Sequence, residues 1–364
     1  MAAPVTTNAD VIVIGGGIAG LTTALAAADR GLHVSLLHVP SAGEASRAAA
    51  GMLAPSVEGM PDAVLSVALE ARDRYPRFLD DLRDRSGVSV TLDRNGILEL
   101  ATSESDLASH AARAGTRAQT LDARALASLE PAFAGHAGAV LHAHDGAVDN
   151  VALMTALEIA VAREARITRH PARVRTIHAG VSPAIVRTEA GDTHAANRLV
   201  LATGAWAAGI DSLPRALPVR PLMGQLLRIE GRHIGHVTYG GGGYLIPRGE
   251  SVVVGATSEE NGFHCATSAE GHDALRDIAR RAAPSLHSAR TLGHWAGLRP
   301  MTPDTLPILG ADPAQPSLLY SCGFSRNGIL LAPWAAEQLA FVLTSEHPPA
   351  SLALFSAARF GPSA

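Results

Sequence analysis

The sequence predicts a mixed α/β protein, α+β overall, in which a parallel-sheet unit is combined with a second, β-rich part. Residues 10–14, Asp-Val-Ile-Val-Ile, are typical of a short strand buried on both faces, because apolar β-branched residues follow one another without polar alternation. A glycine-rich turn and an Ala- and Leu-rich helix over residues 21–30 come next. From Pro214 onward the composition shifts towards β-structure, and 364 residues are enough for two domains that share a large core.

The turn between this strand and this helix fits the pattern G-x-G-x-x-G through Gly15, Gly17 and Gly20. Gly15 allows a tight turn, Gly17 lets the backbone approach a pyrophosphate, and Gly20 lets the helix pack closely on the strand. Backbone N–H groups near Ile18 and Ala19, at the positive end of the helix dipole, would then bind the phosphates. Strand, turn and helix together predict a Rossmann-like dinucleotide-binding unit, and the motif suits NAD and FAD alike.

Charge and composition exclude several classes of protein. Apolar residues make up 47% of the chain and charged residues 18%, which is typical of a globular protein. The net charge is −4 and no basic block occurs, so we expect no nucleic-acid partner. Lysine is absent from the sequence, which excludes a lysine Schiff base and any Walker-type phosphate lysine.

The cysteines and the N-terminus favour a cytoplasmic protein. Cys265 and Cys322 form neither a disulfide framework nor a C-x-x-C motif, which suits a reducing compartment. Residues 1–9 lack the charged start and the apolar core of a signal peptide, and no apolar stretch is long enough to span a membrane. We therefore expect no membrane association.

The second parallel strand, predicted over residues 32–39, ends differently from most dinucleotide-binding units. Such units end this strand with Asp or Glu, whose carboxylate binds the ribose hydroxyls. Here the corresponding residue is His38, and a neutral imidazole lacks the two acceptors of a carboxylate. Either the dinucleotide is bound less tightly, in which case His38→Glu should tighten it, or Glu44 a few residues later binds the ribose.

A run of small residues follows, from Ser46 to Pro55. Small side chains that end in a glycine let the main chain lie flat against a large planar ligand without Cβ clashes. Gly51 and Pro55 interrupt the run, which argues against an ordinary Ala-rich helix. We therefore expect this segment to line the cofactor site.

The middle of the chain is predicted to alternate between helices and short strands. Helices are expected over residues 64–85, 103–114, 121–129 and 151–165, the last of them capped by Asp149 and Asn150. Strands are expected over residues 95–101, over 167–177 with Val174 at the centre, and over 184–187. A buried strand over residues 199–202 then runs into the turn Ala-Thr-Gly-Ala-Trp, residues 202–206.

Three neighbouring residues, His142, His144 and Asp145, raise the question of a metal site. Strand alternation would place both histidines on one face, but no third and fourth ligand is apparent in the sequence. Histidines at a strand end usually make ordinary hydrogen bonds. We therefore expect no metal.

The β-rich part contains the leading candidate for substrate binding. A hairpin is expected from strands 244–248 and 252–257 around the turn Gly249-Glu250, followed by a helix over 268–282 and a strand over 290–299. Arg299 lies just inside the end of this last strand, between Gly297 and Pro300. A planar guanidinium binds a carboxylate through two parallel hydrogen bonds, so we expect Arg299 to bind an acidic group.

The last motif, residues 323–333, opens the final helix, which is expected over residues 327–343. N–H groups without a helical partner at this helix start would stabilise negative charge on a bound ligand. The helix carries Glu337 and Gln338 and no basic residue, which favours a packed core helix over a membrane-surface helix.

Four motifs occur in order: AAAGMLAP at residues 48–55, YLIPR with VVVGAT at 244–257, TPDTLPILG at 302–310, and RNGILLAP at 326–333. With the glycine turn and the ATG turn they resemble the glycine oxidases, a group within the D-amino-acid oxidase family of FAD-dependent enzymes. The resemblance implies a discontinuous Rossmann-like FAD-binding domain from residues 1–85, 145–215 and 290–364. It also implies a β-rich substrate-binding domain from residues 86–144 and 216–289.

The resemblance implies a reaction as well. Arg299 and Tyr244 would bind the substrate carboxylate, with Arg326 as a second arginine beside the site. A small amino acid would lose a hydride from Cα to the flavin, its imine would hydrolyse, and dioxygen would reoxidise the flavin to give hydrogen peroxide. Related sarcosine oxidases attach the flavin to a cysteine, and the chain has no cysteine near the corresponding Gly297, so we expect non-covalent FAD. We also expect a homo-oligomer.

The residues expected to contact FAD come from all of these motifs. They are Gly15, Gly17, Ile18, Ala19, Gly20, His38, Ser46, Ala49, Ala50, Gly51, Met52, Val174, Thr203, Gly204, Trp206, Gly297, Arg326, Asn327, Gly328, Ile329 and Leu330.

Three functions stay open at this point. The first is a glycine oxidase of the thiamine pathway. The second is an oxidase of N-substituted glycines or another small amino acid in a specialised pathway, which is favoured by Phe324 and Met223, where relatives often carry His and a basic residue. The third is a flavin-binding protein without oxidase turnover, or a dehydrogenase that passes electrons to a partner, and His38 favours it.

Overall fold

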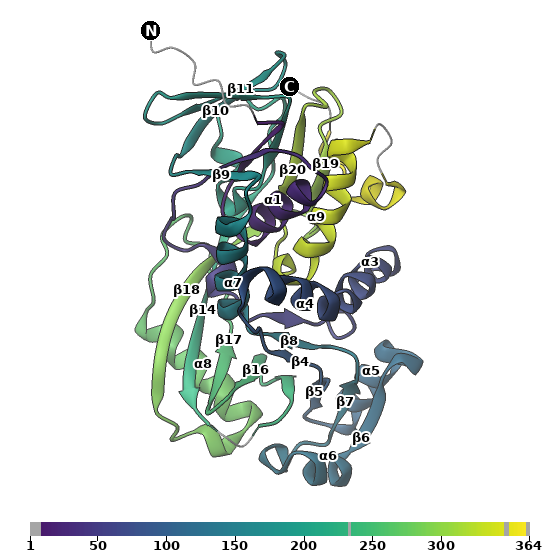
Figure 1. Ribbon diagram of the computed structural model, residues 1–364. Coiled ribbons are helices and arrows are strands. Elements are labelled where there is room, and N and C mark those ends of the chain that lie inside the picture. Colours follow the sequence, from purple (N-terminus) through teal and green to yellow (C-terminus); the bar gives the residue numbers. More distant parts are fainter. Residues whose placement is uncertain (1–8, 232–233, 346–348, 362–364) are drawn as a thin grey trace.

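Two large sheets organise the chain, one in each half of the molecule (Figure 1). The computed structural model describes residues 9–231, 234–345 and 349–361. The upper half in Figure 1 is built on a six-stranded sheet and the lower half on an eight-stranded sheet. A small sheet lies between them, with the strands β3 (Met52–Leu53), β8 (Gly146–Val148) and β4 (Leu92–Asp93).

The six-stranded sheet has the order β19-β20-β13-β1-β2-β9, and every neighbouring pair is parallel except β19 with β20. Its strands are β1 (Val11–Ile14), β2 (Val34–Leu37), β9 (Ile167–His170), β13 (Arg198–Leu201), β19 (Ile308–Ala311) and β20 (Leu318–Cys322). The glycine turn follows β1 in the middle of this sheet, as expected for a dinucleotide-binding unit.

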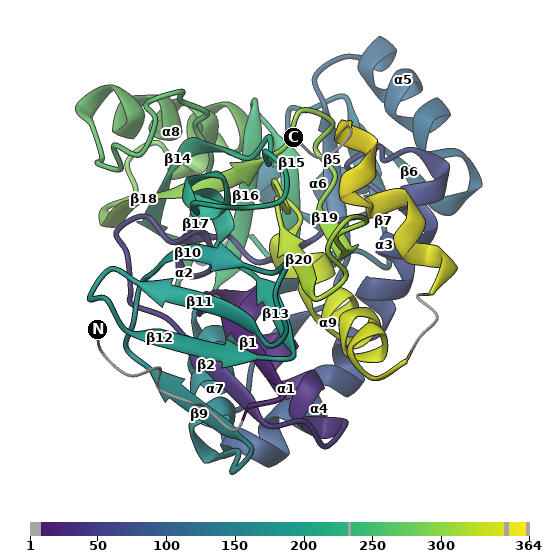
Figure 2. The same cartoon turned by 90° about the horizontal axis from the view of Figure 1, so that it is seen from above.

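Both faces of the six-stranded sheet are covered. Val11 and Val13 pack in the core shared with helices α1 (Ile18–Asp29), α7 (Asn150–Arg163) and α9 (Gly328–Thr344). Ile12 and Ile14 pack on the opposite side, against the antiparallel sheet of β10 (Val174–His178), β11 (Ala184–Thr188) and β12 (Thr193–Ala196) (Figure 2). This double burial explains why β1 lacks polar alternation.

The eight-stranded sheet has the order β18-β14-β17-β16-β15-β5-β7-β6. Its strands are β5 (Ile97–Ala101), β6 (Gln119–Asp122), β7 (Gly138–His142), β14 (Arg220–Glu230), β15 (Val237–Gly240), β16 (Gly243–Arg248), β17 (Ser251–Gly255) and β18 (Thr291–Met301). Leu227, Leu245 and Val254 on one face pack with helices α6 (Ala123–Leu129) and α8 (Ala269–Ala282). Leu226 and Tyr244 lie on the other face, which is turned towards the six-stranded half.

The other helices are short or lie at the edges of the two halves. They are α2 (Ala45–Ala48), α3 (Asp62–Asp73), α4 (Tyr75–Ser86) and α5 (Glu104–Ala114), with the 3-10 helices η1 (Gly115–Arg117), η2 (Pro131–Phe133), η3 (Gly204–Gly209), η4 (Pro284–Leu286), η5 (Ala350–Phe355) and η6 (Ala357–Phe360).

Most predicted elements form, and the differences have local causes. The predicted hairpin around Gly249-Glu250 is confirmed as β16 and β17. The helix predicted over residues 64–85 is two helices, α3 and α4, because Pro76 in the first turn of α4 cannot donate a hydrogen bond to the preceding turn. The helix predicted over residues 121–129 begins at Ala123, since the Asp122 side chain caps it and residues 119–122 form an edge strand.

The strand predicted over residues 167–177 is divided between two sheets. Pro171 separates β9, which extends the six-stranded sheet, from β10 in the antiparallel sheet above it. The predicted division into a cofactor part and a substrate part stays a prediction, with one strand placed differently. Residues 291–301, assigned from sequence to the cofactor part, form β18 and pair along β14 in the eight-stranded sheet.

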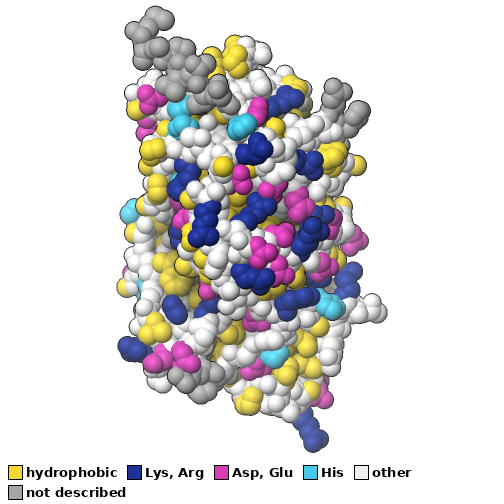
Figure 3. Space-filling view, viewed as in Figure 1, with side chains coloured by type: hydrophobic (Ala, Val, Ile, Leu, Met, Phe, Trp, Pro, Cys, Tyr) yellow, Lys and Arg dark blue, Asp and Glu magenta, His cyan; other side chains and the backbone are white. Residues whose placement is uncertain are grey.

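The surface mixes charges of both signs. Figure 3 shows arginine side chains interspersed with Asp and Glu over the face that carries α3 and α4. Arg74 lies 2.6 Å from Glu70 and Arg83 lies 3.1 Å from Asp80, pairs of the kind that stabilise exposed helices modestly. In the described part of the chain, no helix is both long and apolar enough to cross a membrane.

Candidate active site

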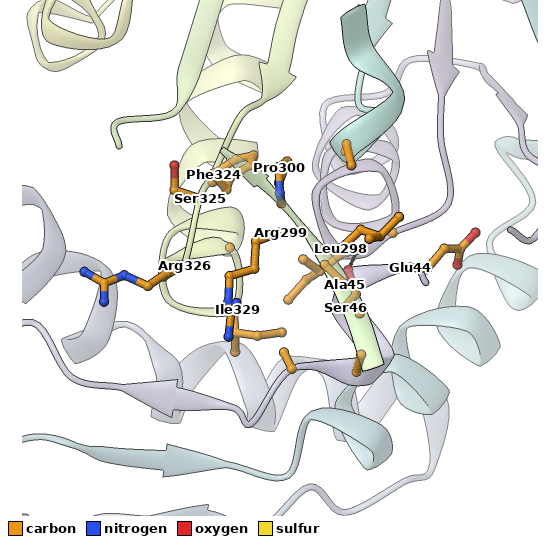
Figure 4. A pocket seen from close by; sticks show the side chains of 18 of the residues that line it. Glu44, Ala45, Ser46, Leu298, Arg299, Pro300, Phe324, Ser325, Arg326 and Ile329 are labelled. Atoms are coloured by element: carbon orange, nitrogen blue, oxygen red, sulfur yellow. Dashed lines mark hydrogen bonds between the residues drawn. The ribbon is translucent and has the colours of Figure 1, made fainter. Parts of the chain in front are cut away.

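A cavity of about 850 Å³ lies between the two halves, and both contribute to its walls. Figure 4 shows Arg299 extending into it from β18, with Arg326 on one side and Glu44, Ala45 and Ser46 on the opposite side. The cavity begins at the glycine turn after β1 and continues to Arg299 and Tyr244 on strands of the eight-stranded sheet. Its volume is in the upper part of the range for ligand pockets.

The glycine turn is built as the sequence motif requires. Gly15 has φ of 115°, and a Cβ on it would lie 2.3 Å from the carbonyl oxygen of Ala202. A Cβ on Gly20 would lie 1.8 Å from the carbonyl oxygen of Gly15, so Gly20 lets α1 pack on the turn. The Ser46 hydroxyl accepts a hydrogen bond from the backbone N–H of Ile18 at 3.0 Å, which ties the small-residue segment to the start of α1.

His38 and Glu44 lie side by side at the cavity wall. His38 Nε2 is 3.6 Å from Glu44 Oε1, and the imidazole lies over Gly16, where a Cβ would be 2.3 Å from the ring. Burial lowers the pKa of His38, while the Glu44 carboxylate acts in the opposite direction. The Glu44 carboxylate also accepts a hydrogen bond from the Ser41 N–H at 2.8 Å. The cavity wall after β2 therefore includes a carboxylate, which comes from Glu44 at the start of α2 and not from position 38.

The small-residue segment lies flat against β18. A Cβ on Gly297 would lie 2.4 Å from the Ala48 Cβ, so only glycine allows this approach. Trp295 Nε1 donates to the Ala48 carbonyl oxygen at 2.9 Å, and Arg248 Nη2 donates to the Ala50 carbonyl oxygen at 2.9 Å. These bonds fix the backbone of residues 48–50 along the cavity.

Two buried hydroxyls in the cavity wall indicate a missing polar partner. Thr203 Oγ1 and Ser321 Oγ are buried and have no hydrogen-bond partner among the described residues. Buried hydroxyls are normally hydrogen-bonded, so a bound ligand with polar groups would satisfy them. The N-terminus of α9 reaches the same cavity through Gly328 and Ile329, and it brings the positive end of the helix dipole with it.

Arg299 and Tyr244 meet in the part of the cavity formed by the eight-stranded sheet. Arg299 Nη1 donates to the Thr257 carbonyl oxygen at 3.1 Å, and its guanidinium lies over Gly224, where a Cβ would be 2.4 Å away. The Tyr244 ring lies over Gly255 in the same way: a Cβ on Gly255 would lie 2.3 Å from the Tyr244 hydroxyl oxygen. Burial raises the pKa of Tyr244 to about 12, and the Arg299 guanidinium beside the hydroxyl opposes the rise.

Most of the residues predicted from sequence line this cavity. They are Arg299, Tyr244, Arg326, Gly15, Gly17, Ile18, Ala19, His38, Ser46, Ala49, Ala50, Gly51, Met52, Val174, Thr203, Gly204, Trp206, Gly297, Gly328 and Ile329. Gly20, Asn327 and Leu330 do not. Gly20 serves helix packing, Asn327 is the N-cap of α9, and Leu330 is buried in the core beneath that helix.

Residues of the candidate metal cluster have other partners. Asp145 accepts hydrogen bonds from the Ser56 N–H at 2.8 Å and from Arg72 Nη1 at 2.9 Å. His142 Nε2 lies 3.3 Å from Glu99 Oε2. Within residues 9–231, 234–345 and 349–361, no group of three metal-ligating side chains comes together.

Sequence reasoning missed several residues of the cavity. Glu58 and Tyr239 line it from a turn after β3 and from β15, and they carried no recognisable motif. Gly224 and Gly255 lie in strands beside the cavity, and glycine within a strand often marks a close approach of another group. Phe263 lines the cavity from the loop after β17, where its ring stacks on Trp206 with centroids 5.8 Å apart.

A model of the family described as FAD dependent oxidoreductase matches residues 10–342. A glycine oxidase of Geobacillus kaustophilus (strain HTA426) is 32% identical, over 96% of this chain and 97% of that protein. The solved structure of a glycine oxidase from Geobacillus kaustophilus has a TM-score of 0.89 at 31% identity, covering 96% of this chain and 98% of that one. The chain belongs to the FAD-dependent oxidoreductase family. The predicted fold class and the resemblance to glycine oxidases are both confirmed.

Two further relatives of this FAD-dependent oxidoreductase differ from the glycine oxidases in the activity for which they are named or in length. The structure of an iminodiacetate oxidase from Chelativorans sp. BNC1 has a TM-score of 0.87 at 25% identity, covering 95% of this chain and 98% of that one. The bifunctional protein ThiO/ThiG of Synechocystis sp. is 33% identical over 97% of this chain. The chain spans 54%, about half, of that longer protein.

FAD is the cofactor of the family, and the cavity fits it. The glycine turn and the α1 N-terminus would hold the pyrophosphate, and His38 and Glu44 lie where the ribose binds in such folds. The flat segment of residues 48–52 and the α9 N-terminus would lie along the flavin, and the unpartnered hydroxyls of Thr203 and Ser321 offer it hydrogen bonds. Among the described residues, neither Cys265 nor Cys322 lines the cavity.

Proposed function

We propose that this protein is an FAD-dependent oxidase of glycine or another small α-amino acid. The main support is that Arg299 and Tyr244 converge over Gly224 and Gly255 in the same cavity as the dinucleotide turn. A guanidinium and a phenol that converge in a cavity suit the carboxylate of a small amino acid. The glycine oxidase relatives support the same substrate class.

Some of the guanidinium N–H groups of Arg299 donate to backbone carbonyl oxygens. The remaining N–H groups would bind the substrate carboxylate. The bond to Thr257 and a longer bond to the Met223 carbonyl oxygen at 3.4 Å fix the guanidinium before substrate arrives. Tyr244 stays protonated at neutral pH, since its pKa is raised, and can donate to the same carboxylate. Fixing the carboxylate orients the substrate Cα–H, and positioning of this kind lowers barriers by up to about 7–11 kcal/mol in model reactions.

FAD would supply the redox chemistry when bound, as the acceptor of a hydride from Cα and the donor of electrons to dioxygen. The N-terminus of α9 would stabilise negative charge at the reduced ring, because its first N–H groups have no helical partner. The substrate would leave as an imine that water hydrolyses to a 2-oxo acid and ammonia.

An N-substituted glycine is a second candidate substrate. Gly240, Gly242 and Gly243 line the cavity beside Tyr244, so this wall presents no side chain to a substituent on nitrogen. Arg326 gives the cavity a second guanidinium, which suits a second carboxylate. The iminodiacetate oxidase relative supports this alternative.

The remaining expectations belong to the same proposal. We propose that the enzyme works in the cytoplasm, uses dioxygen as its electron acceptor, binds FAD non-covalently and forms a homo-oligomer. Service to the thiamine pathway is proposed for the glycine-specific case, supported by the ThiO/ThiG relatives. Acid precipitation would test the flavin linkage, because non-covalent FAD stays in the supernatant.

An oxidase screen tests the proposed substrate class. The purified flavoprotein is supplied in air with glycine, N-methylglycine, iminodiacetate or D-alanine, and hydrogen peroxide and ammonia or amine are measured. The proposal expects peroxide with at least one of the glycines. Glycine as best substrate favours the first candidate, and iminodiacetate favours the second. A protein that releases no peroxide with any of them would contradict the proposal.

A further inference from the structure

Glu58 is a largely buried carboxylate of the active-site cavity that the proposed reaction leaves unused. Its side chain is 11% exposed and lines the same cavity as Arg299 and Tyr244. Among the described side chains it accepts one hydrogen bond, from the Tyr239 hydroxyl at 3.3 Å, and Arg326 Nη2 lies 3.8 Å from Oε2. A carboxylate has about four acceptor positions. Most of this capacity is therefore available to a ligand in the cavity.

The turn that carries Glu58 is held in place by groups outside the cavity. The Asp145 carboxylate accepts hydrogen bonds from the N–H groups of Ser56 at 2.8 Å and Val57 at 3.2 Å. Arg72 pairs with the same carboxylate at 2.9 Å. The position of Glu58 is thus set before a ligand binds, which is the preorganisation that a binding group needs.

Two tyrosines on neighbouring strands connect Glu58 with Arg299, Tyr239 through its hydrogen bond to Glu58 and Tyr244 through its hydroxyl beside Arg299. The Tyr239 and Tyr244 rings lie with centroids 6.1 Å apart on neighbouring strands, and the Tyr244 hydroxyl lies beside the Arg299 guanidinium. The cavity therefore offers positive charge at Arg299 and negative charge at Glu58, with the rings of Tyr239 and Tyr244 beside them. An amino acid in neutral water carries the complementary pair, a carboxylate and an ammonium group.

We propose that Glu58 binds the ammonium group of the substrate and accepts its proton, so that the amino acid reacts as the neutral amine. The inference rests on the proposed function, since it requires an amine beside the carboxylate. One N–H bond breaks, its electron pair stays on nitrogen, and an O–H bond forms on Glu58. The proton passes to solvent after the product leaves. Glycine and N-substituted glycines both meet this requirement.

The charges around Glu58 suit a proton acceptor. Burial raises the pKa of Glu58, Asp145 acts in the same direction, and Arg326, Arg299 and the Tyr239 hydrogen bond oppose the rise. Tyr244 also faces the group, and its own pKa is raised, so it stays neutral. A carboxylate with a raised pKa is a better proton acceptor than an exposed one.

The test compares ligands with and without an amine in the Glu58→Gln variant. Glycolate has the carboxylate but a hydroxyl in place of the amine, and its Kd is measured from the change in flavin absorbance. The Kd of glycine is taken from the concentration dependence of anaerobic flavin reduction. We expect the variant to bind glycine about ten- to a hundred-fold more weakly, as for the loss of a charged hydrogen bond. Glycolate should bind unchanged or more tightly, because a negative charge is removed.

The pH profile gives an independent readout. In the wild type, the reduction rate divided by Kd should fall as the pH falls through the pKa of Glu58, since protonated Glu58 cannot take a proton. In Glu58→Gln this limb should move to higher pH, towards the pKa of the substrate amine. Tyr239→Phe should also move it to higher pH, because the lost hydrogen bond had lowered the pKa of Glu58.

Controls separate the possible failures. Glu70→Gln, the same change at an exposed position on α3 outside the cavity, should alter neither ligand. Equal weakening of glycine and glycolate in Glu58→Gln, or no change in either, overturns the ammonium site and leaves the proposed function standing. A wild-type flavin that no amino acid reduces contradicts the proposed function and the ammonium site together. Flavin content and melting temperature show that each variant is folded.

Discussion

Replacing Arg299 is the sharpest single perturbation of the proposed site. In Arg299→Ala the guanidinium over Gly224 is lost, together with its bonds to the carbonyl oxygens of Thr257 and Met223. The contacts that shape the dinucleotide turn, such as the Ser46 hydroxyl on the Ile18 N–H, lie elsewhere and remain. We therefore expect substrate binding to fail while FAD stays bound.

The size of the effect follows from the hydrogen bonds that Arg299 would make to a carboxylate. Two bonds to a charged group, at about 1.5–3 kcal/mol each, amount to about 3–6 kcal/mol. This corresponds to a loss of roughly 10²- to 10⁴-fold in kcat/KM. Arg299→Lys restores the charge but not the two-pronged geometry, so it should recover about one bond at most.

Steady-state kinetics with the best substrate of the oxidase screen measures these losses. Flavin content per chain and melting temperature serve as controls for the fold. Arg299→Ala with near-normal kcat/KM would refute the assignment of the carboxylate site. Full rescue by Arg299→Lys would show that charge alone matters and that the bidentate geometry is wrong.

The remaining predictions concern the partners of Arg299 and the ribose site. Tyr244→Phe removes one hydrogen bond to the substrate carboxylate, so KM should rise about ten- to a hundred-fold, and an unchanged KM would count against this role. Gly224→Ala places a Cβ 2.4 Å from the Arg299 guanidinium; because a small misplacement can cost about a hundred-fold, kcat/KM should fall by that order while flavin content stays normal, and full activity would show that Arg299 needs no such space. His38 lies 3.6 Å from Glu44, so His38→Glu would place two carboxylates next to each other. Because these charges repel each other, titration of the apoprotein with FAD should show weaker binding. Glu44→Ala should weaken FAD by about ten- to a hundred-fold, whereas tighter binding in His38→Glu would favour a ribose site that lacks a carboxylate.

The sequence predicted the parts of the fold that depend on local pattern. The unbroken apolar run of β1 and the spacing of Gly15, Gly17 and Gly20 depend on double burial and on turn geometry, and both are visible in the residues themselves. Pro76 is equally visible in the sequence, and its missing N–H is the local reason why the helix predicted over residues 64–85 is divided.

Other features depend on long-range pairing, which local pattern does not reveal. Strand β18 pairs antiparallel with β14, a strand that begins some 70 residues earlier in the chain. Glu58 and Tyr239 meet only because the turn after β3 is brought against β15, and neither stands in a conspicuous motif. Gly224 and Gly255 are explained by the side chains that lie over them, Arg299 and Tyr244, which are distant in sequence or across a hairpin.

Anaerobic addition of substrate to the purified protein shows directly whether an amine in the Arg299 site reduces the bound flavin. We expect the bound flavin to lose its yellow colour with glycine or an N-substituted glycine, and air to restore the colour with release of hydrogen peroxide. Arg299→Ala, loaded with the same amount of FAD, should stay yellow at the same substrate concentration. A wild-type flavin that stays oxidised with these amines, or an Arg299→Ala flavin that is reduced as readily as the wild type, would contradict the account.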